Sequence, residues 1–199
     1  NVDVNDEAGH GQTLLHTFAQ PGNTSMVAAL LAAGSVDQAE DRDGDFALHC
    51  AAEGGHVEVA RLLVNAGGDL NVCNGHDSTP LHRAAYEGHV EVARLLISAG
   101  ANTSSQDDYG DTPLHDAARH KHGAGIARLL LDAGCQVDVE SGDEEQPLHI
   151  AARVNADETI RCLLAFGADA NAASGSYGTP LRLALEYHGE RRTVAVLLE

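Results

Sequence analysis

Apolar and small residues recur along the chain in an order that is typical of paired short helices. The order is clearest in residues 74–106, where residues 79–85 read Thr-Pro-Leu-His-Arg-Ala-Ala. Thr can cap a helix, and Pro is tolerated at the first helical position because its missing N–H costs no hydrogen bond there. Gly88 predicts the end of this first helix. The apolar stripe over residues 90–99 then predicts a second helix that stops at Gly100.

The same helix pair recurs at a nearly constant interval. The leucine of the phrase stands 33 residues after the previous one, except for an interval of 34 residues in the fourth repeat, at Leu15, Leu48, Leu81, Leu114, Leu148 and Leu181. The extra residue lies between the two helices of that repeat, near residues 120–125, where a longer loop costs little. A period of this length predicts a single solenoid domain over residues 1–199, in which each repeat packs on its neighbours. The approximate repeats, numbered one to six, are 8–40, 41–73, 74–106, 107–140, 141–173 and 174–199.

The phrase Thr-Pro-Leu-His-x-Ala-Ala is complete at residues 79–85 and 112–118 and partly preserved in the other repeats. With its period, it resembles the ankyrin-repeat family over essentially the whole chain. The resemblance implies an all-α ankyrin-repeat solenoid of helix-turn-helix units with β-hairpin fingers. It also implies a protein–protein interaction module, with a binding surface on the fingers and on the concave face of the first helices. The histidine of the phrase is expected to hydrogen-bond the backbone of a neighbouring repeat.

Composition narrows the possible partners and the compartment. The net charge is −18 and Lys121 is the only lysine, so binding to duplex DNA or to an anionic membrane surface is not expected. The charge favours a basic protein or peptide, although it can also serve solubility alone. No apolar run reaches about 18 residues, so no membrane span is expected. The four cysteines form no Cys-x-x-Cys pair, which predicts free thiols in a reducing compartment, the cytoplasm or the nucleus, with Cys50 and Cys162 in the core. The chain by itself is expected to be a monomer.

Catalytic and metal-binding patterns are missing from the sequence. The phrase histidines are spaced one per repeat, and His120 and His122 are the only close pair, so neither a metal site nor a cofactor is expected. The sequence contains no phosphate-binding loop, no Gly-x-Ser-x-Gly and no His-Glu-x-x-His, so no enzyme activity is expected.

The resemblance places exposed, variable positions just before the Thr-Pro-Leu-His phrase and just after its Ala-Ala. These partner-binding candidates are Arg42, Asp43, Asp45, Glu53, His76, Ser78, Tyr86, Glu87, Asp108, Tyr109, Asp111, Arg119, His120, Glu145, Arg153, Tyr177 and Tyr187. They include all four tyrosines, a residue type enriched at interface hot spots, although a tyrosine here can also be merely exposed. Positive charge is expected in part on the outer face of the second helices, at Arg61, Arg94, Arg128 and Arg161. The fingers would then be acidic, with the binding surface centred on repeats two to four.

Two further alternatives concern modification and context. Asn71 and Asn171 resemble sites that asparaginyl hydroxylases accept in ankyrin repeats, although Asn at this place can also be structural, its amide tying the hairpin. The chain begins with Asn, which suggests a segment of a longer protein. It could then be the regulatory or substrate-recognition segment of an enzyme, a channel or a ubiquitin-ligase subunit, or a spacer that binds nothing.

Overall fold

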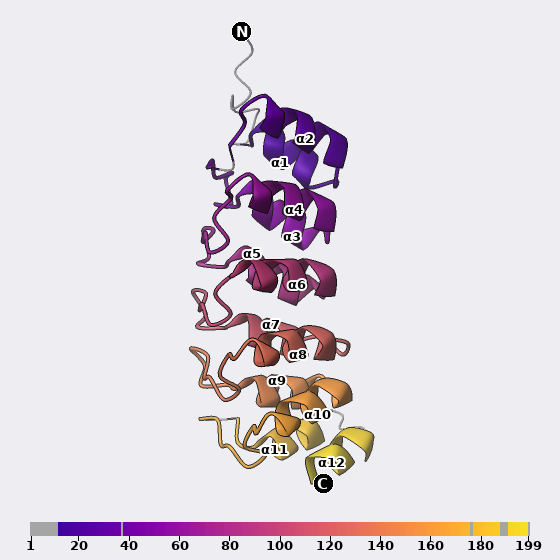
Figure 1. The fold of residues 1–199 in the computed structure, drawn as a ribbon. Coiled ribbons are helices and arrows are strands. Elements are labelled where there is room, and N and C mark those ends of the chain that lie inside the picture. Colours follow the sequence, from indigo (N-terminus) through magenta and orange to yellow (C-terminus); the bar gives the residue numbers. More distant parts are fainter. Residues whose placement is uncertain (1–11, 37, 176, 188–190, 199) are drawn as a thin grey trace. The chain divides into compact units, whose positions relative to one another are not determined.

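The computed structural model describes residues 12–36, 38–175, 177–187 and 191–198 (Figure 1). The chain divides between Asn102 and Thr103 into two compact units, the N-terminal unit and the C-terminal unit. Repeats one and two and residues 74–102 of repeat three fall in the first unit, and residues 103–106 and repeats four to six fall in the second.

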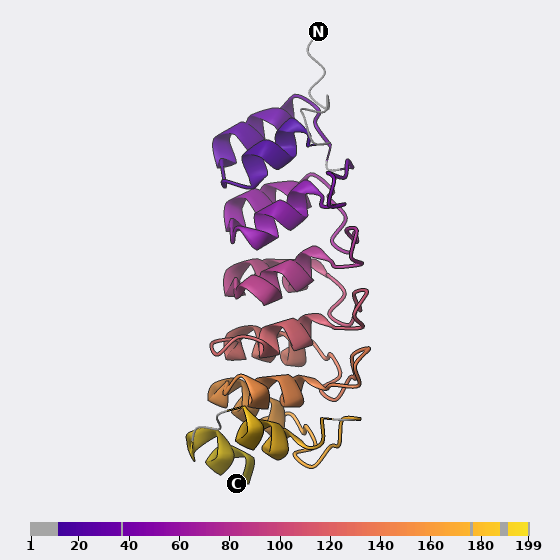
Figure 2. The same ribbon diagram turned by 180° about the vertical axis from the view of Figure 1, so that it is seen from behind.

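The described part of the N-terminal unit is built from three helix pairs. The first helices of the pairs pack on one another in one row, and the second helices form a parallel row (Figures 1 and 2). The connections from one pair to the next all lie on the same side of these helices. The helices are α1 (Leu14–Ala19), α2 (Thr24–Ala32), α3 (Ala47–Glu53), α4 (Val57–Asn65), α5 (Pro80–Glu87) and α6 (Val90–Ala99).

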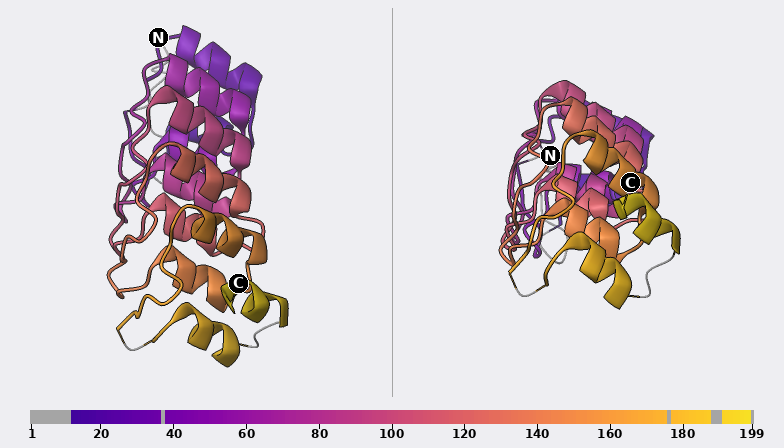
Figure 3. Two further views of the ribbon diagram at one scale, coloured as in Figure 1. Left: turned by 60° about the horizontal axis from the view of Figure 1, so that its bottom comes forward. Right: turned by 90° about the horizontal axis from the view of Figure 1, so that it is seen from below.

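The C-terminal unit repeats this arrangement with three more pairs. Its first helices pack in the order α7, α9, α11 and its second helices in the order α8, α10, α12 (Figure 3). Residues 119–123 separate α7 from α8, in agreement with the lengthened loop expected in repeat four. The helices are α7 (Pro113–Ala118), α8 (Ala124–Asp132), α9 (Pro147–Arg153), α10 (Asp157–Ala165), α11 (Pro180–Glu186) and α12 (Arg191–Leu198).

The phrase of each repeat supplies both a helix start and a core face. In repeat three, the Thr79 hydroxyl accepts a hydrogen bond from the His82 backbone N–H, so Thr79 caps α5 as predicted. Leu81, Ala84 and Ala85 are fully buried, which confirms that this face points inward. The core consists mainly of leucine, alanine, valine and isoleucine, whose burial is the main stabilising term of such a stack.

Other features of the pattern are also confirmed. Helices α5 and α6 end at Gly88 and Gly100, both in the left-handed conformation. Cys50 and Cys162 are buried, and neither forms a disulfide. The sequence therefore predicts the helix pairs and most of their buried residues, although Val90 and Leu95 of the α6 stripe are only half-buried.

The expected β-hairpin fingers are not confirmed. The described residues contain no strand, and an isolated bridge joins Ser174 to Gly178. In place of strands, the connections before α3, α5, α7, α9 and α11 each end in a tip turn, in which one residue donates its backbone N–H to the carbonyl four residues later, at 2.9–3.0 Å. The five tip turns are closed by Asp41 and Asp45, Asn74 and Ser78, Asp107 and Asp111, Ser141 and Glu145, and Ser174 and Gly178.

Candidate functional site

Buried histidines hold the tip turns in place. Three phrase histidines place their ring Nε2 2.9–3.1 Å from a tip-turn carbonyl of the following repeat, in the pairs His16 to Asp45, His49 to Ser78 and His115 to Glu145. His149 Nε2 lies 3.0 Å from the Ala172 carbonyl, two residues before the next tip turn. A carbonyl can only accept, so Nε2 carries the hydrogen, and Nδ1 accepts the backbone N–H three residues earlier. The expected bonds to a neighbouring repeat are thereby confirmed at His16, His49 and His115.

A second set of histidines bonds in the opposite direction within the N-terminal unit. His56 Nε2 lies 2.8 Å from the Gln20 carbonyl, and His89 Nε2 lies 2.8 Å from the Glu53 carbonyl. Both histidines precede a second helix and reach back to the end of the preceding repeat's first helix. Each of these contacts ties a repeat to the one before it through the ring Nε2.

Burial lowers the pKa of His49 and of His115 below the ordinary histidine value. The cause is the loss of solvation of the charged ring, which outweighs the nearby carboxylate and backbone carbonyl that favour it. A proton added at Nδ1 would also face the backbone N–H that this atom now accepts. Within the part of the chain that the structure describes, no three His, Cys, Asp or Glu residues form a group that could hold a metal ion.

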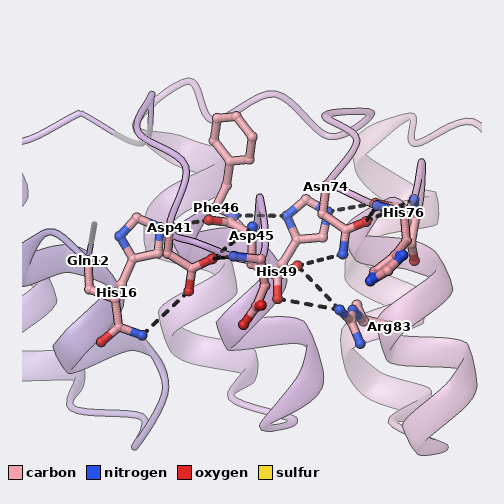
Figure 4. Close-up of polar contacts among 11 residues, drawn as sticks. Gln12, His16, Asp41, Asp45, Phe46, His49, Asn74, His76 and Arg83 are labelled. Carbon is pink, nitrogen blue, oxygen red and sulfur yellow. Dashed lines mark hydrogen bonds and ion pairs between the residues drawn. The ribbon is translucent and has the colours of Figure 1, made fainter. Parts of the chain in front are cut away.

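Asp45 is the centre of a polar cluster in the N-terminal unit (Figure 4). Asn74 Nδ2 donates to Asp45 Oδ1 at 2.7 Å, and Arg83 Nη2 lies 3.4 Å from both Asp45 carboxylate oxygens. The Asp41 carboxylate accepts the backbone N–H groups of Asp43 and Asp45, which closes the tip turn. The prediction that Asp45 is exposed is wrong: it is buried, because its charge is compensated by Arg83 of the next repeat.

Asp111 and Glu145 were also expected to be exposed, and this too is wrong, since both are buried. Arg119 hydrogen-bonds Asp111 through Nη2 and lies 3.7 Å from Asp116, while Arg153 Nη1 lies 3.0 Å from Glu145 Oε1. Each arginine ends or follows the first helix of the same repeat and turns back to the tip turn. The tip turns therefore carry less uncompensated negative charge than the sequence indicates.

A pocket opens among three tip turns of the C-terminal unit. Its volume is about 130 Å³, and we call it the three-turn pocket. It brings together six of the predicted partner-binding residues with two that were not predicted, Ser141 and Asp143. The sequence feature that could have indicated Ser141 and Asp143 is their position in the acidic segment 140–145. The lining residues are Tyr109, Asp111, Arg119, Ser141, Asp143, Glu145, Arg153 and Tyr177.

The remaining predicted residues do not line this pocket. Tyr86 and Tyr187 are 50% and 48% exposed, and Tyr109 at the pocket is 68% exposed. Ser78 and His120 are half-buried. The other predicted residues are exposed, namely Arg42, Asp43, Glu53, His76, Glu87 and Asp108.

The outer arginines are exposed on second helices, as expected. Arg61 and Arg94 each lie 3.4 Å from a glutamate three residues earlier, and Arg128 lies 3.9 Å from Asp132. Exposed pairs of this kind contribute little to stability. They leave the second-helix surface with closely balanced charge.

The two asparagines singled out for hydroxylation are both exposed. Asn71 Oδ1 accepts the backbone N–H of Asn102 at 2.7 Å, and the Asn171 backbone N–H donates to Asp169 Oδ1 at 2.9 Å. The Asn71 amide therefore has a structural role between adjacent repeats. Hydroxylation at either residue stays a prediction.

Comparison with known families agrees with this architecture. A family model described as "Ankyrin repeats (3 copies)" matches residues 1–74, 66–141 and 123–199. The chain belongs to the ankyrin-repeat family. Its fold is an all-α repeat solenoid, and ankyrin repeats generally mediate protein–protein interactions and are typically non-catalytic. No curated protein matches this ankyrin-repeat chain. None of its described helices has the length and apolar character needed to cross a membrane.

Proposed function

We propose that this ankyrin-repeat chain is a non-enzymatic adaptor or targeting module that binds a protein or peptide through its tip turns and the adjoining ends of its first helices. The observation that carries the proposal is the three-turn pocket, in which successive repeats contribute aromatic and charged side chains to one concave site. Concave sites with a few convergent polar groups are the usual places for recognition.

The exposed tyrosines add to this case. Tyr86 follows the Ala-Ala of repeat three, and Tyr109 stands on the tip turn of repeat four. A tyrosine offers a large apolar face at little conformational cost, and its hydroxyl can hydrogen-bond, so it serves well as an interface anchor. Outside an interface, this much exposed aromatic surface brings the chain no stability.

Charge favours a basic partner. The chain carries a net charge of −18, and such a field speeds the encounter with a positively charged peptide. The second-helix surface offers less, because its arginines already lie beside acidic neighbours. Cysteines without a disulfide at Cys50 and Cys162 are consistent with a reducing compartment, the cytoplasm or the nucleus.

A peptide-display selection tests the proposal without a known partner. The chain is immobilised and random peptides are selected on it, and each enriched peptide is then titrated against three proteins. These are the unaltered chain, the tyrosine variant Tyr86→Ala/Tyr109→Ala, and the second-helix variant Arg61→Ala/Arg94→Ala. Both variants change two exposed side chains, so they are matched in extent.

We expect saturable binding that weakens at least tenfold in the tyrosine variant, because removal of a hot-spot aromatic typically costs about 2 kcal/mol or more. The arginine variant should bind like the unaltered chain. Selected peptides that lose affinity only in the arginine variant would place recognition on the second helices. Failure to select any saturable binder would instead favour a spacer.

A further inference from the structure

The three-turn pocket carries a more specific inference, which rests on the proposed function. Tyr109 and Tyr177 come from the first and third of its tip turns, and Ser141, Asp143 and Glu145 come from the turn between them. Its volume of about 130 Å³ far exceeds the roughly 10–15 Å³ that a single water needs. The pocket can therefore admit the end of a partner's side chain.

The first two turns of the pocket are fixed to each other by the backbone. Gly142 donates its N–H to the Tyr109 carbonyl at 2.7 Å. A Cβ built on Gly110 would stand 2.6 Å from the Gly142 nitrogen, which shows how closely the two turns approach. Part of the pocket wall is thus formed before a ligand arrives, and a preformed site binds at a lower entropic cost.

The charges around the pocket favour a cation. Its lining holds three carboxylates, those of Asp111, Asp143 and Glu145, and two guanidinium groups, those of Arg119 and Arg153. Asp116, which lies outside the lining, is a second carboxylate neighbour of Arg119. An anion would have to compete with these carboxylates for arginines that are already paired, whereas a cation meets a net negative lining.

Two details indicate where a cation would bind. Asp143 is exposed at the pocket and has no ion pair among the described residues. Glu145 Oε1 is buried and accepts no hydrogen bond among the described residues, although it forms an ion pair with Arg153 Nη1 at 3.0 Å. A buried acceptor without a donor is unfavourable, so a donor that enters beside Glu145 is stabilised by more than charge alone.

We propose that the three-turn pocket binds an arginine side chain of the partner protein. The guanidinium group is planar, carries five N–H donors and stacks on aromatic rings, so it suits carboxylates flanked by tyrosines. A lysine ammonium offers a compact charge without the planar face. Asp143 and Glu145 receive the N–H donors, and Tyr109 and Tyr177 flank the guanidinium plane.

Small probes test the pocket directly. The backbone amide signals of the whole chain are followed by NMR during titration with N-acetyl-arginine methylamide. The parallel probes are the citrulline analogue, which keeps the shape and loses the charge, the lysine analogue and the aspartate analogue. We expect saturable shifts at Tyr109, Gly142 and Tyr177 with the arginine probe, and at least tenfold weaker binding of the other three.

A charge-matched pair of variants locates the effect. Asp143→Asn should weaken arginine binding roughly two- to fivefold, the size typical of one exposed charge contact. Asp132→Asn, which removes an exposed carboxylate on α8 outside the pocket, should leave it unchanged. Both variants should give the far-UV circular dichroism spectrum of the unaltered chain, because both side chains are exposed.

Several results would overturn the proposal. Equal binding of citrulline or lysine would exclude arginine selectivity, and pocket shifts with the aspartate probe alone would indicate an acidic partner. Equal weakening by Asp132→Asn would show that only the overall charge matters. If display peptides bind through the tip turns without shifting the pocket signals, the pocket proposal fails while the proposed function stands.

Discussion

The contact between the first two turns of the pocket can be tested with two glycine substitutions. Gly110 and Gly134 both lie in the C-terminal unit and both have a positive φ, 73° and 90°. A Cβ on Gly134 would meet nothing within 4 Å, whereas a Cβ on Gly110 would stand 2.6 Å from the Gly142 backbone nitrogen. Gly134→Ala therefore measures the backbone cost alone, and Gly110→Ala measures that cost together with the steric conflict.

The structure sets the expected magnitudes. A left-handed conformation costs an L-residue about 1–2 kcal/mol, and both variants pay this. In Gly110→Ala the two turns must also move apart, which disrupts the 2.7 Å hydrogen bond from Gly142 N–H to the Tyr109 carbonyl. A hydrogen bond of this kind contributes about 0.5–1.5 kcal/mol net. We expect Gly110→Ala to lower the free energy of unfolding by about 1 kcal/mol more than Gly134→Ala.

Urea unfolding followed by far-UV circular dichroism measures this difference, from the shift in midpoint at an unchanged m-value. The arginine probe supplies a second readout, because Gly110→Ala alters the pocket wall without removing a lining side chain. Binding should weaken in Gly110→Ala and persist in Gly134→Ala. Equal midpoint shifts together with equal probe binding would refute the idea that this close backbone approach shapes the pocket.

Three further predictions concern buried groups. Because burial lowers the pKa of His49 and His115, the unfolded chain binds more protons below pH 6.5. Thermal melting measured between pH 7.5 and pH 5 should therefore show a stability that is constant above about pH 6.5. Below that pH the free energy of unfolding should decline by at most about 1.4 kcal/mol per pH unit for each ring. A melting temperature that rises on acidification would contradict this. Asp45→Ala should destabilise the chain by about 1–3 kcal/mol in urea, since it leaves Asn74 and Arg83 without their acceptor, whereas the exposed Asp43→Ala should change stability by under about 0.5 kcal/mol. Burial raises the pKa of the Cys135 thiol to about 11, so a thiol reagent at pH 7.5 should label it far more slowly in the folded chain than in urea, and equal rates would show that it is accessible.

Periodicity alone predicts the repeat architecture because each buried face is local. In α5 and α6 the spacing of Leu, Ala and Val fixes which side is inward, and a glycine ends each helix at the expected residue. The histidine bonds follow from the family resemblance. These features depend on residues within one repeat or on its immediate neighbour, so an alignment of the repeats contains the necessary information.

The burial of Asp45, Asp111 and Glu145 could not be predicted from their place in the repeat alone. In repeats four and five an arginine stands eight residues after the acid, at Arg119 and Arg153, and that spacing spans the first helix. This eight-residue spacing between acid and arginine is a sequence signal that could have predicted the two ion pairs. Asp45 breaks the rule, because Glu53 stands eight residues on and its partner, Arg83, comes from the next repeat.

The opposed histidine bonds in the N-terminal unit have a mechanical consequence. His16 bonds forward from near the start of α1, and His56 bonds back to Gln20 just beyond its end. Since His16 and Gln20 are four residues apart, the two attachments are about 6 Å apart along the helix axis. One attachment would act as a pivot, whereas two separated attachments resist twisting of the second repeat against the first. The loss of either histidine would restore the pivot, and the resulting swing would displace a tip turn more the farther that turn lies from the pivot.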